Sequence, residues 1–301
     1  MNVGSCFSGI GGLDLGLERA GMRVVWQCES DRRLRDLLSE RFPEVPCYED
    51  VRKVARQDGP VPVDLVCGGF PCQDISIAGR RQGLVGERSG LFFEFARVVD
   101  AVRPRLVVVE NVPGLFSSNG GRDFGCVLGT LADIGYGVAW RVLDSRFFGV
   151  PQRRRRVFVV GARADGDPAG AAHRAGQVLA VGTRCQGHTG TRVSPGAGVA
   201  HAITSRAGER LATEDDYIVT ATEDAVRRLT PLECERLQGF PDRWTVPLKS
   251  DSRRYAAIGN AVTVPVAEWI GRRILLAEDA CNHLGRAAGP EQTVDVVPVG
   301  P

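Results

Sequence analysis

The feature of this sequence that most constrains its fold is a regular alternation of short apolar runs with stretches of helical periodicity. The runs occupy residues 3–7, 24–26, 64–67, 106–109, 138–143 and 157–160. Between them, apolar side chains recur at helical spacing, as at Leu13, Leu17 and Ala20. Runs of this length suit buried strands, and the βα alternation predicts a doubly wound, mostly parallel α/β sheet. Such sheets place their sites at the carboxyl ends of strands, so the residues after each run are the first candidates for function.

The character of the chain changes near residue 164. Residues 164–252 contain ten glycines and the loop-like stretch GHTGTRVSPGAG, whereas a helical pattern resumes over residues 265–278. We therefore predict an α/β domain over residues 1–163 and a small, irregular second domain over residues 164–252. A C-terminal segment, residues 253–284, would return to the first domain, and residues 285–301 would form a flexible tail.

Composition excludes several classes of protein. A hydrophobic content of 43% and a charged content of 25% are globular values. There is no apolar run of about 18 residues and no signal-peptide pattern at the N-terminus, so we expect a cytoplasmic protein without a membrane span. Nine cysteines without a CxxC pair, together with four scattered histidines, give no support for a metal site. The two lysines, Lys53 and Lys249, do not form a Walker-type phosphate loop.

The glycine-rich turn FSGIGG, residues 7–12, lies where the first strand meets the first helix. Glycines there allow close approach of a ligand to the backbone, and the helix N-terminus favours a polar or anionic group. Glu29, at the end of the second strand, has the usual place of a carboxylate that accepts from ribose hydroxyls, and Asp50 could bind an adenine amino group. The alternatives are a turn that serves packing alone and a solvated loop carboxylate.

The sequence CGGFPCQDIS, residues 67–76, follows the strand at 64–67. Cys72 comes directly after a proline at the carboxyl end of that strand, where a thiolate could act as a nucleophile if its ionisation were assisted. Cys67, within the strand, is expected to be an inert core residue. Taken alone, Cys72 is equally compatible with a nucleophile and with a structural thiol.

Two further polar groups follow later strands. Glu110 comes after three valines, so burial should raise the pKa of its carboxyl toward a protonated, donating form, and Asn111 could orient a substrate or satisfy the backbone. The run QRRRR begins at Gln152 and enters a strand, which would put Arg154 and Arg156 on the same face as Gln152. The alternatives are a capping carboxylate and a solvated basic run.

Taken together, these stretches resemble the cytosine-C5 DNA methyltransferase family of bacterial or phage type. FSGIGG resembles its S-adenosylmethionine loop, GGFPCQDIS its nucleophile loop, ENV its base-recognition strand end and QRRRR its QxRxR motif. RLTPLECERLQGFP, residues 228–241, and YAAIGNAVTVPV, residues 255–266, are similar to its last two segments. The matches occur in the family's order over nearly the whole chain. A tRNA-directed relative usually carries a PPCQ-like loop, so GGFPCQ favours DNA.

The resemblance implies a Rossmann-like methyltransferase fold and assigns roles to residues. The implied catalytic set is Pro71, Cys72, Glu110, Asn111, Arg154 and Arg156. The implied cofactor set is Phe7, Gly9, Gly11, Gly12, Glu29, Asp50, Leu91, Asn260 and Val262. The implied DNA contacts are Gln73, Ser76, Arg80, Arg81, Arg88, Arg206 and Arg210. No metal is implied.

The implied reaction transfers a methyl group from S-adenosylmethionine to C5 of a flipped-out cytosine in duplex DNA, leaving S-adenosylhomocysteine. Cys72 would add to C6, Glu110 would hydrogen-bond N3 and the exocyclic amine, and Arg154 and Arg156 would act near O2 and a phosphate. The family context implies a monomeric, sequence-specific protein at the bacterial nucleoid. Two alternatives remain open, a restriction-modification system whose cognate endonuclease acts separately and an orphan enzyme without such a partner.

By the same resemblance, residues 164–252 would form the target-recognition domain. This segment holds ten basic and twelve acidic residues, which departs from a simply basic DNA-binding module. We expect its arginines to face the groove, with Arg184, Thr204, Ser205, Arg206 and Arg210 as candidate contacts; an ordinary exposed loop is the alternative at each position. Two other classes compete with the enzyme. They are a nicotinamide-dependent oxidoreductase, which leaves PCQ, ENV and QRRRR unexplained, and a catalytically silent DNA-binding homologue.

Overall fold

The computed structural model describes residues 1–55, 62–71, 90–180, 200–201 and 228–287. Within these residues the main sheet has the strand order β3-β2-β1-β4-β5-β8-β6. Its strands are β1 (Asn2–Cys6), β2 (Arg23–Cys28), β3 (Cys47–Tyr48), β4 (Leu65–Gly68), β5 (Leu106–Asn111), β6 (Tyr136–Asp144) and β8 (Arg155–Arg163). Parallel pairing joins β3, β2, β1, β4 and β5, whereas β8 runs antiparallel to both β5 and β6. The predicted mostly parallel α/β sheet is therefore confirmed.

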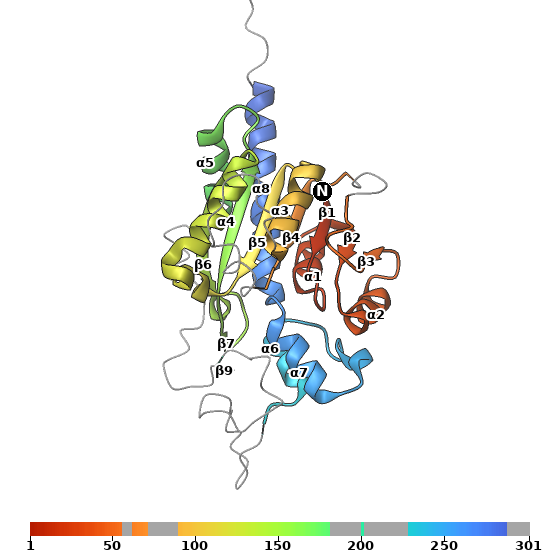
Figure 1. The fold of residues 1–301 in the computed structure, drawn as a ribbon. Helices are drawn as coiled ribbons and strands as arrows, with labels where there is room; N and C mark the ends of the chain where they lie inside the picture. The colour runs from red at the N-terminus through yellow and green to blue at the C-terminus, as the bar shows by residue number, and fades with distance from the viewer. Residues whose placement is uncertain (56–61, 72–89, 181–199, 202–227, 288–301) are drawn as a thin grey trace, which may run out of the picture.

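Helices cover both faces of the sheet (Figure 1). One apolar cluster joins one face to α1 (Gly12–Arg19), α5 (Pro168–Leu179) and α8 (Val264–Ala287). The other cluster joins the opposite face to α3 (Leu91–Val102) and α4 (Arg122–Asp133). Every residue of β5 is buried, as expected for a central strand covered on both sides.

A third apolar cluster lies beside the carboxyl ends of the strands. It is formed by α2 (Arg32–Arg41), α6 (Pro231–Leu237) and α7 (Asp251–Asn260), together with Ile10 of the glycine turn. In Figure 1 these helices lie below the sheet, on the side away from the C-terminal end of α8. The shorter elements are the 3₁₀ turns η3 (Pro113–Phe116), η4 (Ser118–Gly121), η5 (Ser145–Phe147) and η8 (Val246–Leu248), and the pair β7 (Gln152–Arg153) and β9 (Ala200–His201).

The start of the segment 164–252 differs from the expectation of an irregular second domain. Residues Pro168–Leu179 form the regular helix α5, and Ala171, Ala175 and Val178 are buried in the same cluster as the sheet. A Cβ at Gly137 of β6 would lie 2.3 Å from the Ala172 nitrogen, so the helix and strand are in very close contact. The first part of this segment therefore packs as part of the sheet body.

The contact between α1 and α8 depends on Gly16. A Cβ there would lie 2.4 Å from the Ala267 Cβ and 2.7 Å from the Val264 oxygen. We expect Gly16→Ala to lower the free energy of unfolding by about 1–3 kcal/mol because the two helices must separate. Denaturant unfolding measures this. Gly125→Ala is the matched control, since a Cβ at Gly125 of α4 meets no atom within 4 Å; it should stabilise by about 0.5–1 kcal/mol. Equal stability of both variants would contradict the close helix contact.

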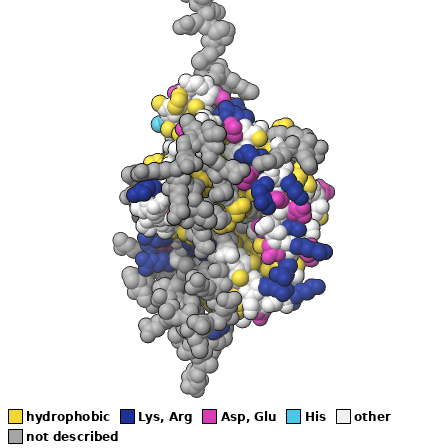
Figure 2. Space-filling model, viewed as in Figure 1, with side chains coloured by type: hydrophobic (Ala, Val, Ile, Leu, Met, Phe, Trp, Pro, Cys, Tyr) yellow, Lys and Arg dark blue, Asp and Glu magenta, His cyan; other side chains and the backbone are white. Residues whose placement is uncertain are grey.

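Charges of both signs are interspersed on the face seen in Figure 2, over the region of α2 and β3. Arg52 pairs with Asp50 at 2.9 Å and Lys53 with Glu49 at 3.0 Å. This side of the molecule is thus not uniformly basic, in keeping with the net charge of +2. Within the described residues, no helix combines the length and apolar character needed to cross a lipid bilayer.

Candidate active site

A cavity of about 820 Å³ lies at the carboxyl ends of four neighbouring parallel strands. Its walls include residues 7–9 after β1, Glu29 after β2, residues 69–71 after β4 and Asn111 at the end of β5. This is the edge at which open α/β sheets bind ligands, and the volume is typical of a small-molecule site. The sequence prediction that the residues after the strands come together is therefore met for these positions.

The glycine turn adopts left-handed backbone conformations at several positions. Phe7 has φ +55°, Gly9 +59° and Gly11 +81°. A Cβ at Gly9 would meet nothing within 4 Å, and Gly9 lines the cavity, so this glycine keeps the backbone open toward a ligand. Gly11 differs from the expectation. It is absent from the cavity wall, and its Cβ position lies 2.8 Å from the Phe42 ring, so Gly11 serves turn geometry and helix packing.

Two carboxylates lie on the cavity wall beside this turn. Glu29 Oε2 accepts a 2.9 Å hydrogen bond from the Gly9 nitrogen, and its Oε1 accepts one of 2.9 Å from the Asp31 nitrogen. Asp50 accepts from both the backbone nitrogen and Nε of Arg52, and these bonds hold the pKa of the Asp50 carboxyl below its usual value. Asp50 is therefore an anion, and both carboxylates remain available as acceptors, since each oxygen can take more than one hydrogen bond.

The wall opposite the sheet comes from the far end of the chain. Ala257 and Asn260 of α7, and Val262 in the connection to α8, line the cavity. A Cβ at Gly12 would lie only 2.6 Å from the Val262 oxygen, so glycine is needed where this connection meets the start of α1. Leu91, the first residue of α3, also lines the cavity. Four residues of the predicted cofactor set, Gly12, Leu91, Asn260 and Val262, thus line the same cavity as Gly9 and Glu29.

Glu110 and Arg156 form an ion pair on the same cavity wall. Glu110 Oε1 lies 3.0 Å from Arg156 Nε, and Glu110 is only 7% exposed. Burial raises the pKa of the Glu110 carboxyl above its ordinary value, although the nearby Arg156 and Arg154 guanidinium groups act in the opposite direction. The expected rise in its pKa is found. A carboxyl in this setting can exchange a proton or a strong hydrogen bond with a bound base.

Arg154 does not share this role. Its side chain is 1% exposed, and its Nη2 donates to the Gly259 oxygen at 2.9 Å and the Ala261 oxygen at 2.8 Å. It is absent from the cavity wall, whereas Arg156 is part of it. The predicted direct electrostatic role of Arg154 at the substrate is therefore replaced by a structural one. Arg154 fixes the α7–α8 connection, which supplies the wall opposite the sheet.

Asn111 lies on the cavity wall, but both ends of its side-chain amide are engaged. Nδ2 donates to the Phe70 oxygen at 3.0 Å, and Oδ1 accepts from the Val112 nitrogen at 2.8 Å. Asn111 therefore links the end of β5 to the residues just before Cys72. Of the two alternatives raised by the sequence, these contacts favour satisfaction of the backbone.

Several predicted residues lie outside the described part of the chain. They are Cys72, Gln73, Ser76, Arg80, Arg81, Arg88, Arg184, Thr204, Ser205, Arg206 and Arg210. Residues 288–301 of the predicted tail, 285–301, are outside it as well, whereas residues 285–287 form the end of α8. Pro71, the residue before Cys72, is described and lines the cavity.

Some contributors to the site were not predicted. Leu34 and Arg35 of α2 line the cavity, and Arg35 Nη1 donates to the backbone oxygen of Glu29 at 2.9 Å. Asp14 is buried beneath the glycine turn, where it accepts from Ser5 Oγ at 3.0 Å and Gln27 Nε2 at 2.7 Å. The sequence feature that could have predicted the burial of Asp14 is its position directly after Leu13, beside the apolar face of the first helix.

Asp14 should make stability depend on pH. Burial is the main cause that raises the pKa of its carboxyl from 3.8 to about 6. Between these values the folded state binds more protons than the unfolded state, so stability falls as pH rises from about 4 to about 6. The two-unit shift corresponds to up to about 3 kcal/mol. We expect the unfolding free energy of the wild type to lose this amount relative to Asp14→Asn between pH 4 and 7, as measured by denaturant titration. A constant difference between the two proteins would contradict it.

Comparison with known proteins extends these observations. The family model described as C-5 cytosine-specific DNA methylase matches residues 1–178 and 186–276. The type II methyltransferase M2.BsuMI of Bacillus subtilis is 33% identical over 91% of this chain and 75% of its own length. The type II methyltransferase M.NgoBI of Neisseria gonorrhoeae is 32% identical over 87% of this chain and 89% of its own length.

Solved structures with the same fold include two methyltransferases. The Dnmt2 methyltransferase of S. pombe matches with a TM-score of 0.66 and 17% identity over 94% of this chain and 99% of that one. The Entamoeba histolytica methyltransferase EhMeth matches with a TM-score of 0.60 and 16% identity over 93% of this chain and 98% of that one. At these identities the structures support the Rossmann-like fold alone. The sequence matches support a more specific conclusion, because they include the glycine turn, the ENV strand end and most of the α7–α8 segment. They show that the chain belongs to the C-5 cytosine-specific DNA methylase family.

Proposed function

We propose that this DNA cytosine-5-methyltransferase acts on a flipped-out cytosine in a specific duplex sequence, through a covalent bond between Cys72 and C6. The observation that carries the proposal is the shared cavity. One cavity is lined by Glu29 and Asp50 as well as by Glu110 and Arg156. Pro71, one residue before Cys72, lines the same cavity. A nucleoside cofactor and a target base can therefore be held side by side.

The cavity residues fit S-adenosylmethionine. Gly9 leaves open space in front of the turn, and Glu29 and Asp50 offer carboxylate oxygens to ribose hydroxyls and an adenine amino group. The rest of the cavity wall near these two carboxylates includes Phe7, Gly12, Leu91, Asn260 and Val262. When bound, S-adenosylmethionine supplies an electrophilic methyl group.

The residues on the substrate side supply nucleophilic and acid–base chemistry. The Cys72 thiolate adds to C6 of the cytosine, which makes C5 electron-rich enough to accept a methyl group. The Glu110 carboxyl holds the proton or hydrogen bond at N3, and Arg156 supports the charge that develops on the ring. After methyl transfer leaves S-adenosylhomocysteine, a water molecule takes the C5 proton. The C5–C6 double bond re-forms, and the bond between C6 and Cys72 breaks to restore the thiolate. A stacked base cannot take part, so the cytosine must leave the helix.

The thiols of the described cysteines support the assignment to Cys72. Burial raises the pKa of Cys28 and Cys234 to about 12 and of Cys47 to about 11, and raises those of Cys6 and Cys67 as well. At neutral pH these thiols stay protonated and are poor nucleophiles. Cys126 of α4 does not line the cavity, whereas Pro71, directly before Cys72, does. Cys72 is therefore the cysteine that the proposal assigns as nucleophile.

The names of the relatives support one further feature of the proposal. Proteins such as M2.BsuMI and M.NgoBI are named type II methyltransferases, so we assign this chain to a restriction-modification system whose endonuclease acts as a separate protein. We further propose a monomer that works on DNA at the nucleoid in the cytoplasm without a metal. The target-recognition domain would lie within residues 164–252 after α5, with Arg206 and Arg210 among its DNA contacts.

Bisulfite sequencing of DNA from cells that express this chain tests the function directly. Protected cytosines in one recurring sequence context are expected, whereas unmodified DNA would contradict the proposal. Trapping on a duplex with 5-fluorocytosine at that site then separates an active enzyme from a silent DNA-binding homologue, because a covalent complex needs a reactive thiolate. A nicotinamide-dependent oxidoreductase would fail both tests.

A further inference from the structure

A buried glutamate outside the cavity connects two of its walls. Glu235 of α6 is fully buried and accepts hydrogen bonds from the Arg243 nitrogen at 2.7 Å and the Thr245 nitrogen at 2.9 Å. It also accepts from the Thr245 hydroxyl and from Arg254 Nη2 at 3.0 Å. A carboxylate with four donors and a cationic partner is well compensated for its burial. Neither Glu235 nor its partners line the cavity.

One arm of this network ends at the glycine turn. Glu235 fixes residues 243 and 245, and Trp244 between them donates from Nε1 to the Ile10 oxygen at 2.8 Å. Ile10 lies between Gly9 and Gly11 and is 1% exposed. The indole also packs edge-on against Phe42 at 6.0 Å between ring centroids. The indole therefore holds the turn from the side opposite the cavity.

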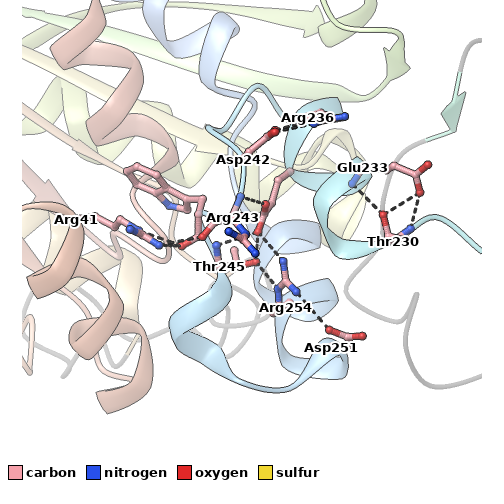
Figure 3. A network of polar contacts seen from close by, with 11 residues as sticks. Arg41, Thr230, Glu233, Arg236, Asp242, Arg243, Thr245, Asp251 and Arg254 are labelled. Carbon is pink, nitrogen blue, oxygen red and sulfur yellow. Dashed lines mark hydrogen bonds and ion pairs between the residues drawn. The ribbon is translucent and has the colours of Figure 1, made fainter.

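Arg41 of α2 fixes the same arm from outside. Its Nε and Nη2 donate to the Trp244 oxygen at 3.0 and 2.8 Å, and its guanidinium carbon lies 5.3 Å from the indole centroid. Figure 3 shows the Arg41 side chain pointing into the loop that carries Arg243 and Thr245. Arg41 thus restrains both the backbone and the ring of Trp244. These contacts keep the indole N–H directed at the backbone oxygen of Ile10.

The other arm ends at α7. Arg254 bonds Glu235, and its Nε donates to Thr245 Oγ1 at 2.9 Å. In Figure 3, Arg254 lies between Thr245 and Asp251, the first residue of α7. About one and two turns later on the same helix, Ala257 and Asn260 line the cavity. The same carboxylate therefore restrains the wall formed by α7.

We infer that Glu235 is a positioning residue for the cofactor, which sets the glycine turn through Trp244 and the α7 wall through Arg254. The inference rests on the proposed use of S-adenosylmethionine at this cavity. Since a misplaced wall weakens every contact made to the ligand, loss of this network should reduce cofactor affinity without direct loss of a ligand contact.

The test measures binding of S-adenosylhomocysteine to the full chain by calorimetry, at a temperature where circular dichroism shows each variant folded. Trp244→Phe keeps a six-membered aromatic ring and removes the pyrrole part of the indole with its N–H, so we expect about a 3- to 10-fold rise in Kd. Glu235→Gln should raise Kd by about 10-fold or more, because it disturbs both arms. The double variant should show less than the product of the two effects, since one arm is shared. Arg236→Gln is the matched control. Arg236 lies on the same helix as Glu235 and forms an exposed ion pair with Asp242, so its replacement should leave this Kd within about 2-fold.

The readouts separate positioning from general destabilisation and from failure of the proposed function. Affinity for duplex DNA, followed by fluorescence anisotropy, should change by less than about 2-fold in Trp244→Phe, and KM for the cofactor should rise more than kcat falls. Wild-type affinity in Trp244→Phe and Glu235→Gln would overturn the inference, as would equal weakening of cofactor and DNA binding. Absence of binding to the wild type would instead refute the proposed cofactor site.

Discussion

Cys72→Ser is expected to abolish methyl transfer, with a fall in kcat of at least about 10³-fold, while S-adenosylhomocysteine and duplex DNA still bind. A serine hydroxyl is far less ionised than a thiol at neutral pH, so addition at C6 becomes the limiting step. Methyl transfer from radiolabelled cofactor under single-turnover conditions measures this step directly. The same variant should form no covalent complex with a 5-fluorocytosine duplex.

Cys126→Ser is the matched control for this experiment. Cys126 lies on α4, partly exposed and away from the cavity wall, and its Sγ lies 4.0 Å from Thr130 Oγ1. Its replacement should leave turnover and trapping unchanged. Turnover by Cys72→Ser at a rate close to that of the wild type would remove Cys72 from its proposed role.

Glu110→Gln is expected to lower the rate of the chemical step by about 10²-fold or more and to change the Kd for S-adenosylhomocysteine by less than about 2-fold. The substitution preserves shape but removes the titratable carboxyl group that faces Arg156. Single-turnover rates and calorimetry separate the two effects. If rate and affinity fell together by similar factors, Glu110 would be a structural residue of the cavity.

Most strands could be predicted from the sequence because a central parallel strand is apolar on both faces. Residues 106–109 gave the position of β5, and the structure extends that strand to Asn111. The carboxylates after the strands could be placed for the same reason, since parallel strands end at one edge. Glu29 and Glu110 are on the cavity wall as a result.

Other features depend on partners distant in sequence. Helix α5 is rich in glycine and alanine, and its small side chains allow close packing on β6. The sequence of α5 contains no long apolar run from which this packing could be predicted. Arg154 belongs to a basic run that resembles a solvated surface, and its burial depends on carbonyl groups of Gly259 and Ala261, about a hundred residues later. The exclusion of Gly11 from the cavity likewise depends on the position of the Phe42 ring.

The close approach of Gly12 to the Val262 carbonyl has a consequence for how ligand binding and folding are linked. The cavity depends on the packing of α1 against α7 and α8. A bound cofactor would therefore contact segments from the beginning and from the end of the described chain and stabilise their association. Occupancy then resists complete unfolding as well as local opening of the turn. A ligand at one hundred times its Kd adds about 2.7 kcal/mol to the stability of the whole body.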